Sequence, residues 1–183
     1  GVVSVGELFP FERRFRNEGR YCGCGALLAD CAFWQDILQI PGVADKLDDL
    51  CGAEHHPFLR LRHFSAFRRS ILREELPPNV ERGVHALRKL IGRLADATGR
   101  EVLVDTSKSP NVALLYAQTG FDVSVLHLVR DSRGTMYSWR GRSGNSGFTG
   151  QKNTLRRVHP IQLPRTALEY HATNRCAEKT AGL

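Results

Sequence analysis

Hydrophobic positions along the chain fall into short continuous runs and longer stripes at helical spacing, which together predict an α/β protein. The short runs predict strands over 2–5, 101–105 and 123–129. No internal repeat or second domain is visible in the sequence, so we expect a single domain over residues 1–183. The stripes, with proline and glycine at their ends, predict helices over 31–39, 43–51, 60–75, 80–99, 111–119 and 163–179.

The run 123–129 is the most informative of these elements, because it is apolar at nearly every position and ends abruptly in charged residues that begin with Arg130. Such a run predicts a strand covered on both faces of a parallel sheet. The helix 111–119 would connect it to the strand 101–105 as a βαβ unit, whose two strands lie parallel. Ligands bind beyond the carboxyl ends of strands in open α/β sheets. We therefore expect 105–108 and Arg130 to emerge at one ligand-binding edge.

Composition and charge narrow the class of partner. The 183 residues are 42% hydrophobic and 25% charged, as in a globular protein, and no apolar stretch is long enough for a membrane span. The net charge of +7 indicates an anionic partner, a description that nucleotides, nucleic acids, acidic glycans and anionic membranes all satisfy. No secretory signal is visible, and five cysteines are an odd number for a disulfide framework, so we expect reduced thiols in a cytoplasm.

A guanidinium at the end of a strand suits a phosphate or a carboxylate. The stretch Arg130-Asp-Ser-Arg-Gly-Thr-Met-Tyr-Ser138 also resembles the 3′-phosphate-binding motif of PAPS-dependent sulfotransferases, Arg-Asp-x-Arg-(Gly/Ala)-x-x-x-Ser after a strand. The resemblance implies that Arg130 and Ser138 bind the 3′-phosphate of the sulfate donor PAPS, 3′-phosphoadenosine 5′-phosphosulfate. In the alternative, Asp131 or Ser132 caps a helix and the arginines are merely exposed.

The segment Ser107-Lys108-Ser109-Pro110 stands where a strand is expected to meet a helix N-terminus, a place that attracts anions. Sulfotransferases of this type carry a similar Ser/Asn-Lys-(Ser/Asp)-Pro element. In relatives that sulfate protein tyrosines its lysine stabilises the transferring sulfuryl group, so the resemblance makes Lys108 a candidate catalytic residue. A fixed cation lowers the barrier to in-line transfer because charge accumulates on the leaving oxygens. In the alternative, the hydroxyls cap the helix and Lys108 points into solvent.

A Gly-Glu pair follows an early strand in the same relatives, and its glutamate accepts the proton of the attacking hydroxyl. Gly6-Glu7 resembles this pair, so the resemblance makes Glu7 the general base. Cytosolic small-molecule sulfotransferases use a histidine instead. An exposed loop glutamate is the alternative interpretation of Glu7.

Cys22-x-Cys24 and Cys31, followed by a Phe-Trp pair, resemble a recurring element of bacterial members of the family. In an alternative interpretation, the three cysteines ligate zinc together with a fourth ligand from His55, His56 or elsewhere. The Cys-x-Cys spacing, however, is tighter than that of the usual structural zinc site. We therefore expect no metal here, and sulfuryl transfer requires none.

The resemblance implies a three-layer P-loop-like fold, in which a parallel sheet is flanked by helices. Two parts of that fold have no match. The family begins with a strand and a Gly-x-x-Arg-Ser-Gly-Thr-Thr loop that cradles the 5′-phosphosulfate, whereas Gly141-Arg-Ser-Gly144 follows an expected helix. The closing strand and helix also lack a counterpart, and the only methionine is Met136. We therefore expect a partial domain, truncated at both ends, that binds donor weakly and is weakly active or inactive.

The expected function is transfer of a sulfuryl group from PAPS to a hydroxyl or amine acceptor. Small molecules, glycans, lipids and peptides are all compatible acceptors, because acceptor pockets are built from variable helices and loops. Nucleic acid is not an expected partner of such an enzyme.

Two other functions fit parts of the pattern. A nucleotide kinase or other phosphoryl-transfer enzyme would need a metal-holding carboxylate after a strand, and Asp105 is the candidate. A nucleic-acid or polyanion-binding module would use the basic region 60–73, with Phe58, Phe64 and Phe67 stacked on bases. At their spacing, these aromatic residues more readily face a core.

Overall fold

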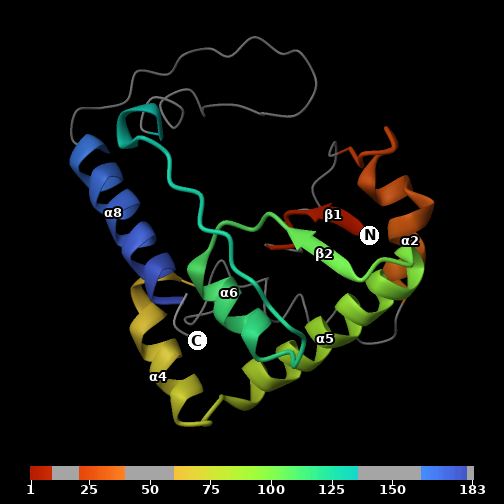
Figure 1. The fold of residues 1–183 in the computed structure, drawn as a ribbon, viewed down its shortest axis with the longest axis horizontal. Helices are drawn as coiled ribbons and strands as arrows, with labels where there is room; N and C mark the ends of the chain where they lie inside the picture. The colour runs from red at the N-terminus through yellow and green to blue at the C-terminus, as the bar shows by residue number, and fades with distance from the viewer. Residues whose placement is uncertain (10–20, 40–59, 136–161, 181–183) are drawn as a thin grey trace. The chain divides into compact units, whose positions relative to one another are not determined.

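Figure 1 shows a computed structural model of the chain, which describes residues 1–9, 21–39, 60–135 and 162–180. The protein is mixed α/β, as predicted, with a small parallel sheet and several helices. Its chain divides into two compact units, Gly1–Ser124 and Val125–Leu183. The helix expected over 43–51 lies outside the described residues.

The sheet of the first unit pairs two strands that are far apart in the sequence. Strand β1, Val2–Gly6, runs parallel to strand β2, Val102–Asp105, with Val2 opposite Val102 and Ser4 opposite Val104. Both strands were predicted from their apolar runs. Their parallel pairing places both carboxyl ends at one edge of the sheet, and ligands bind at this edge in open α/β sheets.

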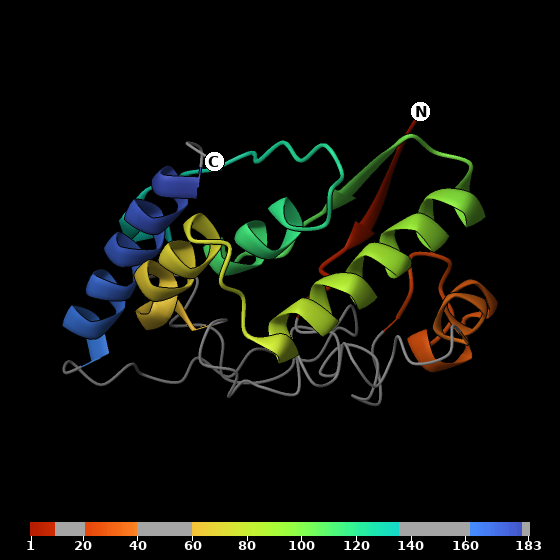
Figure 2. The same ribbon diagram turned by 90° about the horizontal axis from the view of Figure 1, so that it is seen from below.

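Helix α5, Pro78–Thr98, is the main support of this sheet. It lies against β2 and also contacts α2, Ala32–Leu38, and α6, Pro110–Ala117 (Figures 1 and 2). It begins at Pro78, two residues before the predicted start, and ends before Gly99, close to the predicted end. Its most buried side chains form one stripe at helical spacing, namely Val80, Ala86, Leu87, Leu90 and Leu94.

The remaining predicted helices that fall on described residues are also present. In the first unit the region predicted as helix 60–75 forms a short 3₁₀ turn, Leu61–His63, followed by α4, Phe64–Leu72. In the second unit, α8 covers Gln162–Thr180. None of the helices among the described residues combines the length and the apolar character needed to cross a membrane.

The predicted strand over 123–129 is wrong. These residues are extended but pair with no strand among the described residues, and they are not buried. Leu126 and Leu128 are 83% and 81% exposed. A continuous apolar run indicates a buried strand only when neighbouring strands supply the backbone hydrogen bonds and helices cover its two faces. The βαβ unit expected around α6 is therefore incomplete in the part of the chain that the structure describes.

Side chains of α8 hold this extended segment within the second unit. The imidazole Nε2 of His127 lies 2.9 Å from Oδ1 of Asn174. The hydroxyl of Tyr170 donates a hydrogen bond to the carbonyl oxygen of Arg130. The three-layer P-loop-like arrangement is accordingly not seen in the described residues, where the sheet has two strands.

The different burial of two leucines yields a stability test. Leu87 is fully buried on α5, so Leu87→Ala should lower the free energy of unfolding by about 2–5 kcal/mol. Leu126→Ala removes the same atoms from an exposed site and should change the free energy of unfolding by less than about 0.5 kcal/mol. Chemical denaturation of both variants measures the difference. Equal losses would show that 123–129 is buried as the sequence pattern predicts.

Candidate functional site

The carboxyl ends of β1 and β2 bring together the two predicted catalytic residues, Glu7 and Lys108. Glu7 directly follows β1, and Lys108 comes three residues after the end of β2. The ammonium Nζ of Lys108 donates a hydrogen bond to Oε1 of Glu7 and forms an ion pair with it. A carboxylate and an ammonium from distant parts of the chain therefore meet at the sheet edge.

A bulge at the end of β1 sets the direction of Glu7. The register shifts between Ser4 and Gly6, and Gly6 has a φ of 73°, which a residue with a side chain rarely adopts. The carbonyl oxygen of Gly6 still accepts a hydrogen bond of 2.9 Å from the backbone N–H of Thr106. The ladder thus continues past the bulge, and Glu7 leaves the sheet beside the segment that carries Lys108.

The carboxylate of Asp105 fixes this arrangement. Its Oδ1 accepts hydrogen bonds from the backbone N–H of Leu8 at 3.0 Å, the backbone N–H of Ser107 at 2.9 Å and the hydroxyl of Ser107 at 2.8 Å. Its Oδ2 accepts a hydrogen bond of 2.6 Å from the hydroxyl of Tyr116 on α6. One side chain therefore joins the end of β1, the end of β2 and helix α6.

Ser107 and Phe9 extend the same network. The Ser107 hydroxyl donates to Asp105 and accepts a hydrogen bond of 2.9 Å from the backbone N–H of Phe9. The Phe9 ring packs edge to face on Tyr116, with centroids 6.2 Å apart. Ser109 stands at the N-cap of α6 but makes no side-chain capping bond. The hydroxyl of Ser107 therefore ties two loops together, instead of capping the helix.

The Glu7–Lys108 pair is open to solvent. The side chain of Lys108 is 72% exposed and that of Glu7 is 38% exposed. Exposed ion pairs contribute little to stability, about 0–1 kcal/mol, because water competes for both charges. The pair can therefore separate at low cost when a polar ligand approaches. The segments on either side of the pair are joined by the hydrogen bonds of Asp105 and Ser107, while the pair itself is accessible.

Arg130 belongs to the second unit, and Ser138 lies outside the described residues. Arg130 is exposed, and its guanidinium lies against Gly134 in the helical turn 132–135. Asp131 accepts a hydrogen bond of 2.8 Å from the backbone N–H of Arg133 and forms an ion pair with the Arg133 guanidinium. The side-chain hydrogen bond from Arg133 is the main cause of a lowered pKa at Asp131.

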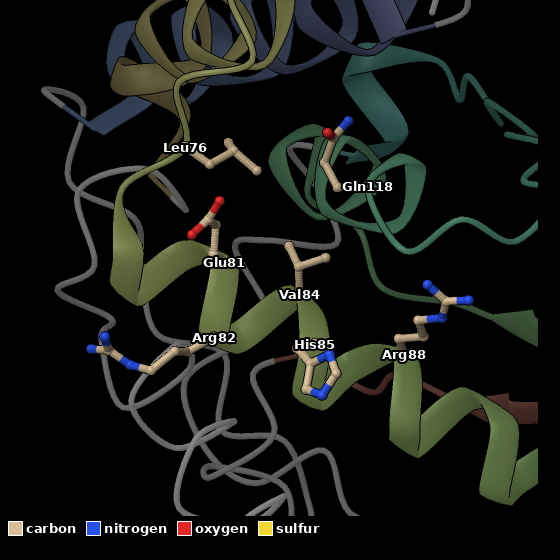
Figure 3. Close-up of a pocket in the computed structure, with 7 residues that line it drawn as sticks. All are labelled: Leu76, Glu81, Arg82, Val84, His85, Arg88 and Gln118. Atoms are coloured by element: carbon tan, nitrogen blue, oxygen red, sulfur yellow. The ribbon is translucent and has the colours of Figure 1, made fainter.

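A surface pocket of about 490 Å³ lies along α5 (Figure 3). It meets α6 at Gln118, just beyond the carboxyl end of that helix, whereas Lys108 precedes its first residue. The pocket and the Glu7–Lys108 pair are therefore at opposite ends of α6. The residues that line the pocket are Leu76, Glu81, Arg82, Val84, His85, Arg88 and Gln118.

In comparisons with known proteins, no protein family, no curated protein and no solved structure matches the chain.

Asp105 was predicted from the sequence only as a candidate metal ligand, whereas its carboxylate accepts four hydrogen bonds from protein groups. Part of that role has a local signal, because Asp-x-Ser after a strand is typical of a turn in which the carboxylate accepts the N–H two residues later. Its bonds to Leu8 and Tyr116 have no such signal. They depend on the pairing of β1 with β2 and on the path of α6.

Removing the negative charge of Asp105 tests this network. Asp105→Asn replaces one acceptor oxygen by an N–H₂ group that faces donors, and it should lower the free energy of unfolding by about 2–4 kcal/mol. Tyr116→Phe removes one hydrogen bond and should cost about 1 kcal/mol. Asp96→Asn is the matched control on an exposed face of α5, with an expected change below about 0.5 kcal/mol. Equal effects at Asp105 and Asp96 in chemical denaturation would contradict the proposed anchoring.

Proposed function

We propose that the protein is a sulfotransferase, which transfers a sulfuryl group from PAPS to a hydroxyl or amine acceptor. The observation that carries the proposal is the contact of Glu7 with Lys108 at the carboxyl ends of two parallel strands. These residues are 101 positions apart, and each was assigned a separate chemical role from its own motif. A general base and a cation for the leaving group must both reach the transferring sulfuryl group, one on each side of the sulfur atom, and two side chains at neighbouring strand ends are placed to do so.

The transfer step follows from the chemistry of the two side chains. The acceptor hydroxyl attacks sulfur while the Glu7 carboxylate takes its proton. A new sulfur–oxygen bond forms, and the bond between sulfur and the 5′-phosphate oxygen breaks. Negative charge develops on that leaving oxygen, where the Lys108 ammonium would donate a hydrogen bond. The products are the sulfated acceptor, 3′-phosphoadenosine 5′-phosphate and a protonated Glu7, which returns its proton to solvent.

The ion pair brings the two groups together at the sheet edge before substrates bind. Because an exposed pair is weak, acceptor and donor can replace this contact with contacts of their own. Substrate binding would thus separate the base from the cation and aim each at a different oxygen.

The donor's 3′-phosphate is assigned to Arg130 and Ser138 through the resemblance of their motif. Two observations are compatible with that role for Arg130. It is exposed, and the second arginine of the motif, Arg133, is engaged by Asp131. A planar guanidinium can bind two oxygens of one phosphate at once, which gives both affinity and orientation.

The hydrogen bonds of the Asp105 carboxylate weaken the phosphoryl-transfer alternative. Magnesium would need free carboxylate oxygens, but both oxygens of Asp105 accept hydrogen bonds from protein groups. Base stacking by the region 60–73 is weakened in a similar way. Phe64 and Phe67 are buried, with exposures of 2% and 0%, so their rings face the core.

Calorimetric titration with 3′-phosphoadenosine 5′-phosphate tests the donor site. We expect binding to the full natural chain, with any flanking sequence it has, and preference for this ligand over the 2′-phosphate isomer. Arg130→Ala should raise Kd by about 10–100-fold, the value of a charge-assisted hydrogen bond or two. Arg175→Ala on α8 removes an equal charge from an exposed site and should leave Kd unchanged. Equal binding of both isomers, or equal loss in both variants, would reject the sulfotransferase proposal.

The roles of Glu7 and Lys108 have a kinetic test. Lys108→Ala should lower kcat by about 10²–10³-fold, because charge on the leaving oxygen is no longer stabilised. Glu7→Gln should lower it by about 10²–10⁴-fold through loss of the base. The measurement is release of 3′-phosphoadenosine 5′-phosphate from PAPS with a panel of alcohol, phenol and amine acceptors.

Two exposed residues provide matched controls for this kinetic test. Lys89→Ala and Glu101→Gln make the same chemical changes away from the sheet edge. They should leave kcat unchanged. If Lys108→Ala or Glu7→Gln kept the wild-type kcat, the proposed role of that side chain would be wrong, even if calorimetry confirmed donor binding.

A further inference from the structure

Three cysteine side chains converge in the first unit, in a segment to which the proposed sulfuryl transfer assigns no role. The Sγ atoms of Cys22, Cys24 and Cys31 all lie within 4.8 Å of one another. The Sγ atoms of Cys24 and Cys31 are 3.7 Å apart. All three residues have free thiols. Among the described residues, these cysteines are the group of side chains arranged closely enough to hold a metal ion.

A tight turn brings Cys22 and Cys24 to the same place. Tyr21 and Leu27 form an isolated antiparallel bridge, and the residues between them close the loop. The backbone N–H of Cys22 donates a hydrogen bond of 2.8 Å to the carbonyl oxygen of Ala26. The N–H of Gly25 donates one of 2.9 Å to the carbonyl oxygen of Cys22, and Gly25 has a φ of 90°, which only glycine adopts readily.

Cys31 reaches the turn from the start of helix α2. A short 3₁₀ turn, Leu28–Asp30, redirects the chain after the bridge, and Cys31 is the N-cap residue of α2. Cys31 is buried, with 4% exposure, whereas Cys24 is exposed. The cluster thus has a protein-facing side and a solvent-facing side, so an ion can enter from solvent and meet thiols already held by the backbone.

The spacing of the sulfur atoms fits a tetrahedral metal centre. Zinc–thiolate bonds of about 2.3 Å at tetrahedral angles require sulfur atoms about 3.8 Å apart. The distance of 3.7 Å between the Sγ atoms of Cys24 and Cys31 is close to that value. All three Sγ atoms lie within 4.8 Å of one another, so the Sγ atom of Cys22 would need to move by only about 1 Å. Soft thiolate ligands select zinc or copper(I) over magnesium and calcium.

We propose that Cys22, Cys24 and Cys31 bind one Zn²⁺ ion through three thiolates, with solvent in the fourth position. The protons of the thiols leave to solvent on binding, and no oxidant or reductant is involved. The sequence spacing had led us to expect no metal. The proposal stands on the convergence of the three sulfur atoms and is independent of the sulfotransferase activity.

Such an ion would fasten the turn to helix α2, which packs on α5. Trp34 and Ile37 of α2 are buried, and Asp36 forms an exposed ion pair with Arg93 of α5 at 2.6 Å. The expected effect of the ion is to stabilise the contact between the turn and helix α2.

Cobalt and zinc titration of the reduced full chain tests the site. Co²⁺ should produce a thiolate-to-metal charge-transfer band and the intense visible bands of a tetrahedral centre, and one equivalent of Zn²⁺ should abolish them. Zn²⁺ should also raise the midpoint of thermal unfolding, because it binds the folded chain. Cys24→Ser should weaken zinc binding on the order of tenfold or more, since removing even an outer-shell partner can cost that much.

Cys24→Ser is the decisive variant because Cys24 is exposed and its replacement should leave the fold intact. Cys176→Ser is the matched control, a half-buried cysteine on α8, and should bind zinc like the wild type. Cys31→Ser removes a buried ligand and needs circular dichroism to verify folding. Unchanged zinc affinity in Cys24→Ser, equal loss in Cys176→Ser, or a Cys24–Cys31 disulfide that persists with zinc present would overturn the proposal.

Discussion

The structure of the sheet edge depends on one carboxylate, that of Asp105. It accepts hydrogen bonds from Leu8, Ser107 and Tyr116, which belong to the segment after β1, the segment after β2 and helix α6. These donors would otherwise lie partly buried without acceptors, and an unsatisfied buried donor costs about 1–3 kcal/mol. Two strands alone make a marginal sheet. The carboxylate and helix α5 together make this small sheet a defined platform, and the positions of Glu7 and Lys108 follow from it.

The sequence was a good guide to the parts of this platform but a poor guide to what joins them. The strands over 2–5 and 101–105, helix α6 and the placement of Glu7 and Lys108 after strand ends all have local signals, namely apolar runs and a Ser-Pro helix start. The bond from Tyr116 to Asp105 joins residues 11 positions apart, and that from Leu8 joins residues 97 positions apart. Such contacts follow from the path of the chain through space, which hydrophobic periodicity does not encode.

The segment 123–129 also shows that an apolar pattern in the sequence does not determine which tertiary contacts form. Its composition describes the environment in which an apolar strand is stable, a sheet interior with partners on both edges. Composition does not supply those partners. In the described residues the segment is instead extended and exposed, and His127 and the Arg130 carbonyl bond to Asn174 and Tyr170 of α8. Exposed leucines and valines that pair with no strand among the described residues form a surface that another strand would cover favourably. The failed strand prediction therefore identifies an exposed apolar stretch, 125–129, among the described residues of the second unit.

The cysteines illustrate why spacing in sequence and distance in space must be judged separately. Cys-x-Cys is too tight for the usual zinc motifs when only the intervals are counted. The intervals matter because they normally decide whether sulfur atoms can converge. Here a glycine turn, the Tyr21–Leu27 bridge and a 3₁₀ turn achieve that convergence by other means. Since a metal ion responds to the positions of its ligands and not to their order in the chain, the observed sulfur positions outweigh the interval rule.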